Sequence, residues 1–508
     1  MKMDILLNSL PSLSSTQWAI GGALLYLVIY LARAAYNLFL SPLARLPGPK
    51  FAAVSDAWYC YQWTSGRYVW RIEEAHRKYG PVVRIGPSEV SFATPQSFRD
   101  IYGHRTRGEQ IFPKSRFYAV PQPEAGIVAE RNVEKHRNTR RLLSHGFSLK
   151  SLKEQEAFLE DRLSLLVQQL RRVGGDGQRA LSVKNWFHWM VFDIIGELAF
   201  GETFNALQSG KSHFWIDTIH DAGAMVGWFE VGRRLPLMWP LILCMLPTGM
   251  KGRFDRFLEY SRAMTRKRVQ KKDHVQHADF FANLLASNAK ERHNEEWLLA
   301  NANVLVIAGS DTTATALTAI TYYLGLNKDK QRALQDEIRG TFESAQMINA
   351  DSLASLPYLN AVIEEGLRLF PPTAFGLPRE SPGAMVDGVW IPKGTVVHTS
   401  SWTTTHDERY FTNPRSFIPE RWLAPSHHRA DATFRADEHD AAKPFSLGPR
   451  GCLGINLATL ELRMVIARLA WEFDWTMSSG DDFDFEKEAT FEGFWKVPDP
   501  LIKFKSRA

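Results

Sequence analysis

Cys452 is the side chain of this sequence best suited to chemistry. It is one of only three cysteines among 508 residues, and it stands in the segment Phe-Ser-Leu-Gly-Pro-Arg-Gly-Cys-Leu-Gly, residues 445–454. Three glycines let the backbone of this segment turn tightly and lie against a flat partner. Apolar residues at helical spacing follow, and a helix N-terminus together with the adjacent Arg450 lowers the pKa of a thiol. The segment therefore predicts a cysteine that is presented as a thiolate.

A thiolate in this position could be a nucleophile, half of a disulfide or a metal ligand. The other cysteines, Cys60 and Cys244, lie far away in the sequence and the total is odd, which argues against a disulfide. Zinc needs several ligands and a nucleophile needs a nearby base, and neither pattern accompanies Cys452. An axial ligand of haem iron fits better, with Arg450 paired to a haem propionate. An inert buried cysteine is the remaining alternative, and the spaced phenylalanine, glycines and arginine around Cys452 disfavour it.

A second group of polar residues interrupts a long apolar helix that is predicted over residues 296–326. Residues 308–313 read Ala-Gly-Ser-Asp-Thr-Thr, and most of these are poor helix formers. We expect the Thr312 hydroxyl to bond to the Ala308 carbonyl and to open the helix, while Gly309 lets a flat group or dioxygen approach the backbone. A buried helix that tolerates polar residues is the alternative, but such clustering in an apolar helix favours a function.

Oppositely charged residues recur in the second half of the chain. Glu365 and Arg368 stand three residues apart on one face of a predicted helix. Such pairs are common on protein surfaces, so this one is weak evidence by itself. Two prolines follow it, and Arg421 comes later, within Phe-Ile-Pro-Glu-Arg-Trp at 417–422. The charges become informative only in combination with the cysteine segment.

The N-terminal segment predicts a membrane anchor. Residues 5–32 carry no charge, and the apolar run continues past Arg33 to Leu40. A helix over 18–32 spans about 22 Å, short of the roughly 30 Å of a bilayer core, whereas a helix that reaches Leu40 spans about 34 Å. Basic residues after the segment place the following chain on the cytoplasmic side. A cleaved signal peptide is the alternative, but the stiff Leu-Pro-Gly-Pro at 46–49 favours an anchor followed by a hinge.

Composition and pattern define the class of the rest of the chain. It is 45% hydrophobic and 12% aromatic, which excludes global disorder, and its net charge of +6 is too mild to indicate nucleic-acid binding. Residues 79–92 alternate around Gly-Pro turns as a β-hairpin does, residues 130–345 are mostly helical in pattern, and short strands such as 389–391 and 395–399 follow. The predicted fold class is mainly α with small β-sheets.

Taken together, these segments resemble the cytochrome P-450 superfamily. The haem-binding loop of that family has the pattern Phe-x-x-Gly-x-Arg-x-Cys-x-Gly, and residues 445–454 match every fixed position. The resemblance extends from about Leu46 to the C-terminus and implies the cytochrome P-450 fold, preceded by an N-terminal transmembrane helix. It divides the chain into residues 1–45, a membrane anchor and hinge, and residues 46–508, a haem-thiolate catalytic domain.

The resemblance implies which residues bind the cofactor, haem b. They are Cys452, the axial ligand of the iron, and Phe445, Arg450, Gly309, Arg140, His136 and Arg379. His136 stands where the family commonly has tryptophan, four residues before the arginine that contacts a haem propionate. This departure leaves Arg140 as the main propionate partner, with His136 and Arg379 as further candidates. The exposed neighbours Lys135, Arg137 and Arg141 could form a basic docking face for an acidic reductase.

Five further residues receive roles in catalysis and scaffolding. Thr312 would help to deliver protons to dioxygen bound at the iron, and Asp311 would supply them. Glu365, Arg368 and Arg421 would form a buried charge triad. Its role would be structural, because it would fix the loop that presents the cysteine.

The implied activity is that of a monooxygenase. One atom of dioxygen would enter a lipophilic small molecule, by hydroxylation or multistep oxidation, and the other would leave as water. Electrons would come from NADPH through an NADPH–cytochrome reductase, since the sequence has no dinucleotide fingerprint or flavin domain. The implied location is the endoplasmic reticulum membrane, with a single pass and a cytoplasmic catalytic domain.

Short stretches of the sequence, such as residues 84–87 and 143–147, resemble those of filamentous-fungal members of the superfamily that act in secondary metabolism. They point to a terpenoid, polyketide or peptide-derived substrate. The expected pocket walls are residues 104–130, 214–246, 301–308, 373–377 and 491–495. Two alternatives are a haem-thiolate isomerase or ring-rearranging enzyme and a non-enzymatic haem-binding sensor. Neither needs a proton relay, so the Asp311–Thr312 pair argues against both.

Overall fold

The computed structural model describes residues 14–105, 110–119, 122–240, 244, 249–271, 280, 294–480 and 482–507. Part of the predicted anchor, residues 5–13, lies outside these ranges. So do residues 106–109, 120–121, 241–243 and 245–246 of the predicted pocket walls. Within the described ranges the fold is mainly helical with small sheets, as predicted.

Helices make up most of the fold. They are α2 (Ser15–Ala35), α3 (Lys50–Val54), α4 (Ala57–Thr64), α5 (Tyr68–Tyr79), α6 (Pro95–Tyr102), α7 (Val133–Ser144), α8 (Leu149–Glu154), α9 (Glu156–Gly174), α10 (Val183–Phe200), α11 (Ala206–Ser209), α12 (Phe214–Arg234), α14 (Met250–Lys271), α16 (Glu295–Leu326), α17 (Lys328–Thr341), α18 (Ala350–Ala354), α19 (Pro357–Leu369), α20 (Ser401–Thr405), α21 (Ile455–Glu472) and α22 (Phe485–Glu488). The strands are β1 (Val82–Gly86), β2 (Glu89–Phe92), β3 (Leu181–Ser182), β4 (Arg379–Glu380), β5 (Ala384–Val386), β6 (Val389–Ile391), β7 (Val396–Thr399), β8 (Phe473–Met477), β9 (Thr490–Phe491), β10 (Trp495–Lys496) and β11 (Leu501–Ser506).

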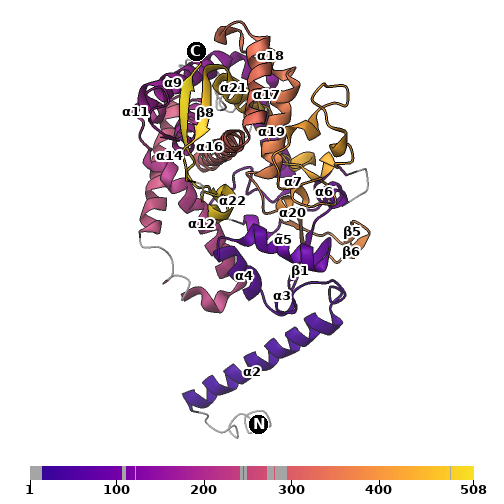
Figure 1. The fold of residues 1–508 in the computed structure, drawn as a ribbon. Coiled ribbons are helices and arrows are strands. Elements are labelled where there is room, and N and C mark those ends of the chain that lie inside the picture. Colours follow the sequence, from indigo (N-terminus) through magenta and orange to yellow (C-terminus); the bar gives the residue numbers. More distant parts are fainter. Residues whose placement is uncertain are drawn as a thin grey trace, which may run out of the picture.

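The N-terminal helix α2 stands apart from the rest of the protein. It extends away from the helical body in Figure 1, and none of its side chains is buried. Ser14 caps its start through a capping box with Gln17, and a π-helical turn, Tyr36–Leu40, continues it. The span Ser15–Leu40 has 26 residues and a mean hydropathy of 1.6. At 1.5 Å per residue it reaches about 39 Å, which is enough to cross a bilayer core.

Arg84 ties the end of this span to the body. The side chain is 2% exposed and donates hydrogen bonds to the carbonyls of Asn37 (2.7 Å), Gly86 (3.2 Å) and Pro87 (2.6 Å). A buried guanidinium that is satisfied by backbone carbonyls fixes the chain segments that carry them. The junction between anchor and body is therefore braced on the hairpin β1–β2.

The predicted hairpin forms the edge of the largest sheet, whose strand order is β1-β2-β7-β4. Strands β1 and β2 pair antiparallel, with Val83 opposite Ser91. Strand β7 joins β2 in parallel and places β4, with Arg379 opposite Val397, on its other side. This sheet brings Arg379 from the C-terminal half next to the N-terminal half of the chain.

The long helix α16 runs through the middle of the body, where Figure 1 shows it nearly end-on. It packs against α10, α14, α19 and α21. In its most apolar window 72% of the residues are buried, so it is a core helix in spite of its hydropathy. The helix is continuous from Glu295 to Leu326, so the predicted opening near Thr312 does not occur.

Candidate active site

A tight loop before α21 presents Cys452. A short 3-10 turn, Gly448–Arg450, leads into it, and the Cys452 amide donates to the Phe445 carbonyl over 2.8 Å. Gly448 has a φ of +68°, and a Cβ at this position would lie 2.1 Å from the carbonyl oxygen of Tyr102. Only glycine fits this conformation and this close approach.

The electrostatics of the thiol differ from the sequence-based prediction. Cys452 is accessible at the surface of the protein atoms. Even so, burial raises the pKa of the thiol, and this outweighs the Gly454 amide and Arg140, which lower it. The predicted low pKa is therefore wrong for the protein alone, because desolvation by the surrounding chain is the larger effect. Metal coordination removes the proton from such a thiol outright.

The arginine whose charge acts on the thiol is Arg140 and not Arg450, which corrects the prediction. Arg140 Nη1 donates to the Gly451 carbonyl over 2.6 Å, and its charge lowers the pKa of Cys452. The Arg450 guanidinium instead donates to the carbonyls of Glu130 (2.7 Å) and Arg131 (3.1 Å). Arg450 belongs to the loop motif itself, whereas Arg140 reaches the loop through the position of α7.

Arg140, Arg379, Arg450 and Lys114 form a cation cluster beside this loop, and His136 lies among them. Burial and the neighbouring arginines lower the pKa of Lys114 well below its usual value, and lower that of His136 to about 3. Burial and Arg379 lower the pKa of Arg450 to about 10. Like charges held this close together disfavour one another, so the cluster is suited to binding an anion.

Lys114 is a member of this cluster that no sequence pattern indicated. It is 5% exposed, and its Nζ donates to the carbonyls of Ile127 (3.0 Å) and Val128 (2.6 Å). An isolated β-bridge to Arg379 brings it there. A single lysine in a loop matches no sequence motif. Its β-bridge partner Arg379 is also far away in the sequence, so the contact could not be predicted.

One face of α16 is accessible along the polar segment. Ala308 is exposed and Thr312 is half-buried, although most of the helix is buried. Thr312 Oγ1 donates to the Ala308 carbonyl over 2.6 Å, the bond expected from the sequence. Gly309 also lets α10 approach α16, since a Cβ there would lie 2.6 Å from Ile195 Cδ1. Its predicted contact with the cofactor stays a prediction.

Two other polar residues of the segment point into the core. Asp311 is 3% exposed and lies 3.4 Å from His188 on α10. Thr313 bonds to Glu461 of α21, whose pKa burial raises to about 8. Asp311 and Thr312 are therefore adjacent in the chain but face different sides of the helix.

The structure brings Glu365, Arg368 and Arg421 together. Each side chain is 0% exposed. Arg368 makes a fork with Glu365 through two bonds of 2.8 Å, and Arg421 Nε donates to the same carboxylate over 3.2 Å. Arg421 also pairs with Asp437, a buried carboxylate that no motif indicated. The network links α19 to the segment that leads to the cysteine loop.

Three of the expected pocket walls converge on one residue, Trp63. Its ring lies 5.6 Å from Phe117, 5.6 Å from Phe375 and 6.1 Å from Phe491. A fourth wall, the start of 301–308, binds the 122–129 loop, because the Asn301 side chain accepts from the Ile127 amide over 2.9 Å. These walls expected from the sequence thus meet in space, three of them through aromatic side chains.

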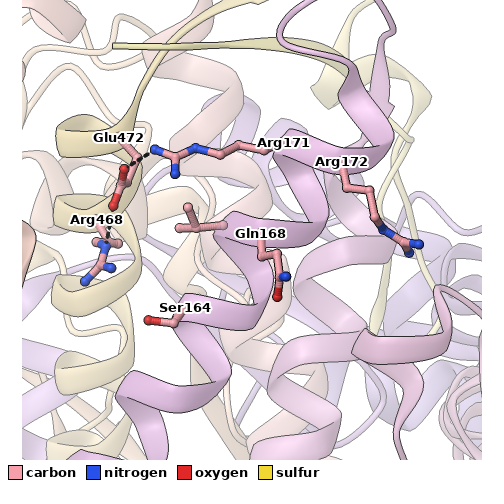
Figure 2. Close-up of a pocket in the computed structure, with 7 residues that line it drawn as sticks. Ser164, Gln168, Arg171, Arg172, Arg468 and Glu472 are labelled. Atoms are coloured by element: carbon pink, nitrogen blue, oxygen red, sulfur yellow. Dashed lines mark hydrogen bonds and ion pairs between the residues drawn. The ribbon is translucent and has the colours of Figure 1, made fainter. Parts of the chain in front are cut away.

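A separate surface hollow of about 520 Å³ lies between α9 and α21 (Figure 2). It is lined by Ser164, Val167, Gln168, Arg171, Arg172, Arg468 and Glu472. Glu472 pairs with both Arg171 and Arg468. All of these residues except Val167 are polar or charged, and none is among the predicted site residues, so the hollow is distinct from the site around Cys452.

Comparison with known proteins identifies the family. The family model described as Cytochrome P450 matches residues 55–503. The chain belongs to the cytochrome P450 family. It is similar to the cytochrome P450 monooxygenase poxC of Penicillium oxalicum, with 53% identity over 482 residues, 95% of this chain and 93% of the relative. It is also 40% identical to the cytochrome P450 monooxygenase BOA3 of Botryotinia fuckeliana, over 93% of each chain.

Membership makes this P450 a haem-dependent monooxygenase whose iron is held by a cysteine thiolate. The residues present fit this cofactor. Cys452 offers an accessible thiol, and the cation cluster beside it suits the negatively charged carboxylates of a haem. Within the described residues, no group of three or more His, Cys, Asp or Glu side chains converges to hold a metal.

Proposed function

We propose that this P450 oxidises a lipophilic intermediate of fungal secondary metabolism, such as a terpenoid or polyketide, by hydroxylation or multistep oxidation. NADPH supplies the electrons through an NADPH–cytochrome reductase. The observation that carries the proposal is the accessible Cys452 thiol beside Arg140 and the cation cluster. The aromatic walls around Trp63 support an apolar substrate, and similarity to fungal monooxygenases supports the setting.

The haem, when bound, supplies the iron centre at which dioxygen is reduced and one oxygen atom is transferred. In the proposal the Cys452 thiolate would hold the haem iron, and the Phe445 carbonyl accepts a hydrogen bond from the Cys452 amide and so orients the loop. The cation cluster binds the haem carboxylates. Asp311 supplies protons and Thr312 passes them on, and both residues belong to α16.

Glu365, Arg368 and Arg421 have a structural role in the proposal. They are buried together and tie α19 to the chain before the cysteine loop. Residues 1–45 form the anchor and hinge, and residues 46–508 form the catalytic domain on the cytoplasmic face of the endoplasmic reticulum. The unburied apolar span Ser15–Leu40 and its bracing by Arg84 support this division.

The test is expression of the full chain in a fungal host that makes candidate intermediates, followed by mass spectrometry of extracts with and without the gene. Microsomes from this host are then given the compound that disappears, with NADPH and heavy-isotope dioxygen. We expect one product oxygen per oxidation to come from the labelled gas. A product that forms without NADPH or dioxygen would overturn the proposal.

A further inference from the structure

Asp311 has a buried partner on a neighbouring helix. His188 of α10 places Nε2 3.4 Å from Asp311 Oδ1, and the two side chains are 8% and 5% exposed. The contact joins α10 to α16 one residue before Thr312. Because both groups are removed from bulk water, the protonation state of one constrains that of the other.

The hydrogen bonds of His188 determine how many protons the pair holds. Nδ1 lies 2.9 Å from the Lys184 carbonyl, which can only accept, so Nδ1 carries a hydrogen. Nε2 then faces Oδ1, where two lone pairs would repel each other. A hydrogen bond between these two atoms therefore needs one further proton, carried either by the imidazolium or by the carboxylic acid.

The geometry allows Asp311 to move this proton toward Thr312. Successive helical residues project about 100° apart, so the carboxyl faces α10 while the Thr312 hydroxyl lies on the accessible face near Ala308. A hydrogen bond over 3.4 Å is long and therefore weak. Delivery of the proton requires the Asp311 side chain to rotate from His188 toward the side of the helix that carries Thr312.

We propose that His188 is a positioning residue that keeps one transferable proton on the Asp311 pair. The inference rests on the roles proposed above for Asp311 and Thr312. In each delivery Asp311 gives this proton to the Thr312 hydroxyl, whose own proton moves on toward the haem side. The pair is left as neutral histidine and carboxylate, and one proton from water restores it. Only protons move, and no electron is transferred.

Two substitutions of His188 test the roles of its two ring nitrogens separately. H188Q places an amide near the Nε2 position, so it retains a contact with Asp311 but holds no titratable proton. H188N places an amide near the Nδ1 position, so it retains the bond to Lys184 and loses Asp311. W189F is the matched control, because the Trp189 indole is the next side chain on α10 and bonds to Ser212 instead.

The first measurement is independent of turnover. Histidine ¹⁵N NMR of the full-length holoenzyme in its diamagnetic ferrous carbonyl form, with H188Q used for assignment, reports the protonation of each ring nitrogen. We expect a protonated Nδ1, and an Nε2 signal that shifts in D311N. An unprotonated Nδ1, or a His188 signal that D311N leaves unchanged, would overturn the inference whether or not a substrate is known.

The second measurement is the fate of NADPH with the substrate found in the labelling experiment. General acid catalysis is worth at least about 100-fold, so we expect H188Q and H188N to lower product per NADPH by about tenfold or more, with peroxide rising in step. W189F should match the wild type. H188Q should add less than about twofold in a D311N background. Coupling at the wild-type level in H188Q, or effects of H188Q and D311N that multiply, would contradict the role.

Discussion

Replacing Arg368 by alanine is expected to prevent haem incorporation. Arg368 donates two hydrogen bonds to Glu365 and three to the carbonyls of Thr405, Pro414 and Ser416, and its side chain is fully buried. The variant leaves all these acceptors in the core without their donor. The carbonyls belong to the segment that leads to the cysteine loop, so the loss disorders the site and not only α19.

The magnitude follows from the burial. Removing one partner of a buried ion pair costs about 3–5 kcal/mol, out of a total stability of about 5–15 kcal/mol. At about 1.4 kcal/mol per factor of ten, this shifts the equilibrium between ordered and disordered loop by roughly two to three and a half orders of magnitude. R368K should be intermediate, because lysine retains the charge but not the fork that holds Glu365.

The assay is the reduced carbon monoxide difference spectrum of membranes, normalised to the amount of chain by immunoblot. The matched control is R71A, which removes another arginine three residues from a glutamate, with the same kind of contact at 2.7 Å but with side chains 50% and 57% exposed. An exposed pair is worth about 0–1 kcal/mol, so R71A should load haem normally. An R368A protein with the spectrum of R71A would refute the reasoning.

Three further predictions concern the site and its core. T312A should bind haem normally but divert NADPH electrons to peroxide, and an unchanged product yield per NADPH would contradict the proposed proton delivery. G448A should fail to incorporate haem, because its Cβ would meet the Tyr102 carbonyl, whereas G388A, where a Cβ meets open space at a similar positive φ, should still load haem in the same spectrum. Burial raises the pKa of Glu461 from 4.5 to about 8, so the native state holds a proton that the unfolded state has lost, and stability falls as pH rises between these values. The urea midpoint of unfolding should therefore fall less over this pH range in E461Q than in the wild type. An equal dependence of the midpoint on pH in both proteins would refute the assignment.

The sequence located the reactive segments well because their signals are local. The cysteine loop, the polar segment of α16 and the hairpin β1–β2 each depend on residues adjacent in the chain. The bond from Thr312 to Ala308 is likewise a contact within one helical turn. Family resemblance supplied what spacing alone could not, namely that Glu365 and Arg421 meet.

The directions of side chains and the pKa values of buried groups could not be predicted from local sequence patterns. Arg450 turns to the Glu130 carbonyl and Gly309 accommodates α10, because helices far apart in sequence pack there. The pKa of Cys452 rises because the folded chain shields the thiol from water, and a sequence motif gives no information about this shielding. Lys114 and His188 were missed for the same reason, since each acquires its setting only through tertiary contacts.

The central claim is that Cys452 is the axial thiolate ligand of haem iron. The most direct measurement is the Soret band of the purified ferrous carbonyl form, recorded for the wild type, C452S and the matched cysteine variant C60S, which changes a buried cysteine of α4. We predict the red-shifted band of a thiolate-ligated carbonyl in the wild type and C60S, and its loss in C452S. A red-shifted band that persists in C452S, or that the wild type lacks, would contradict the account.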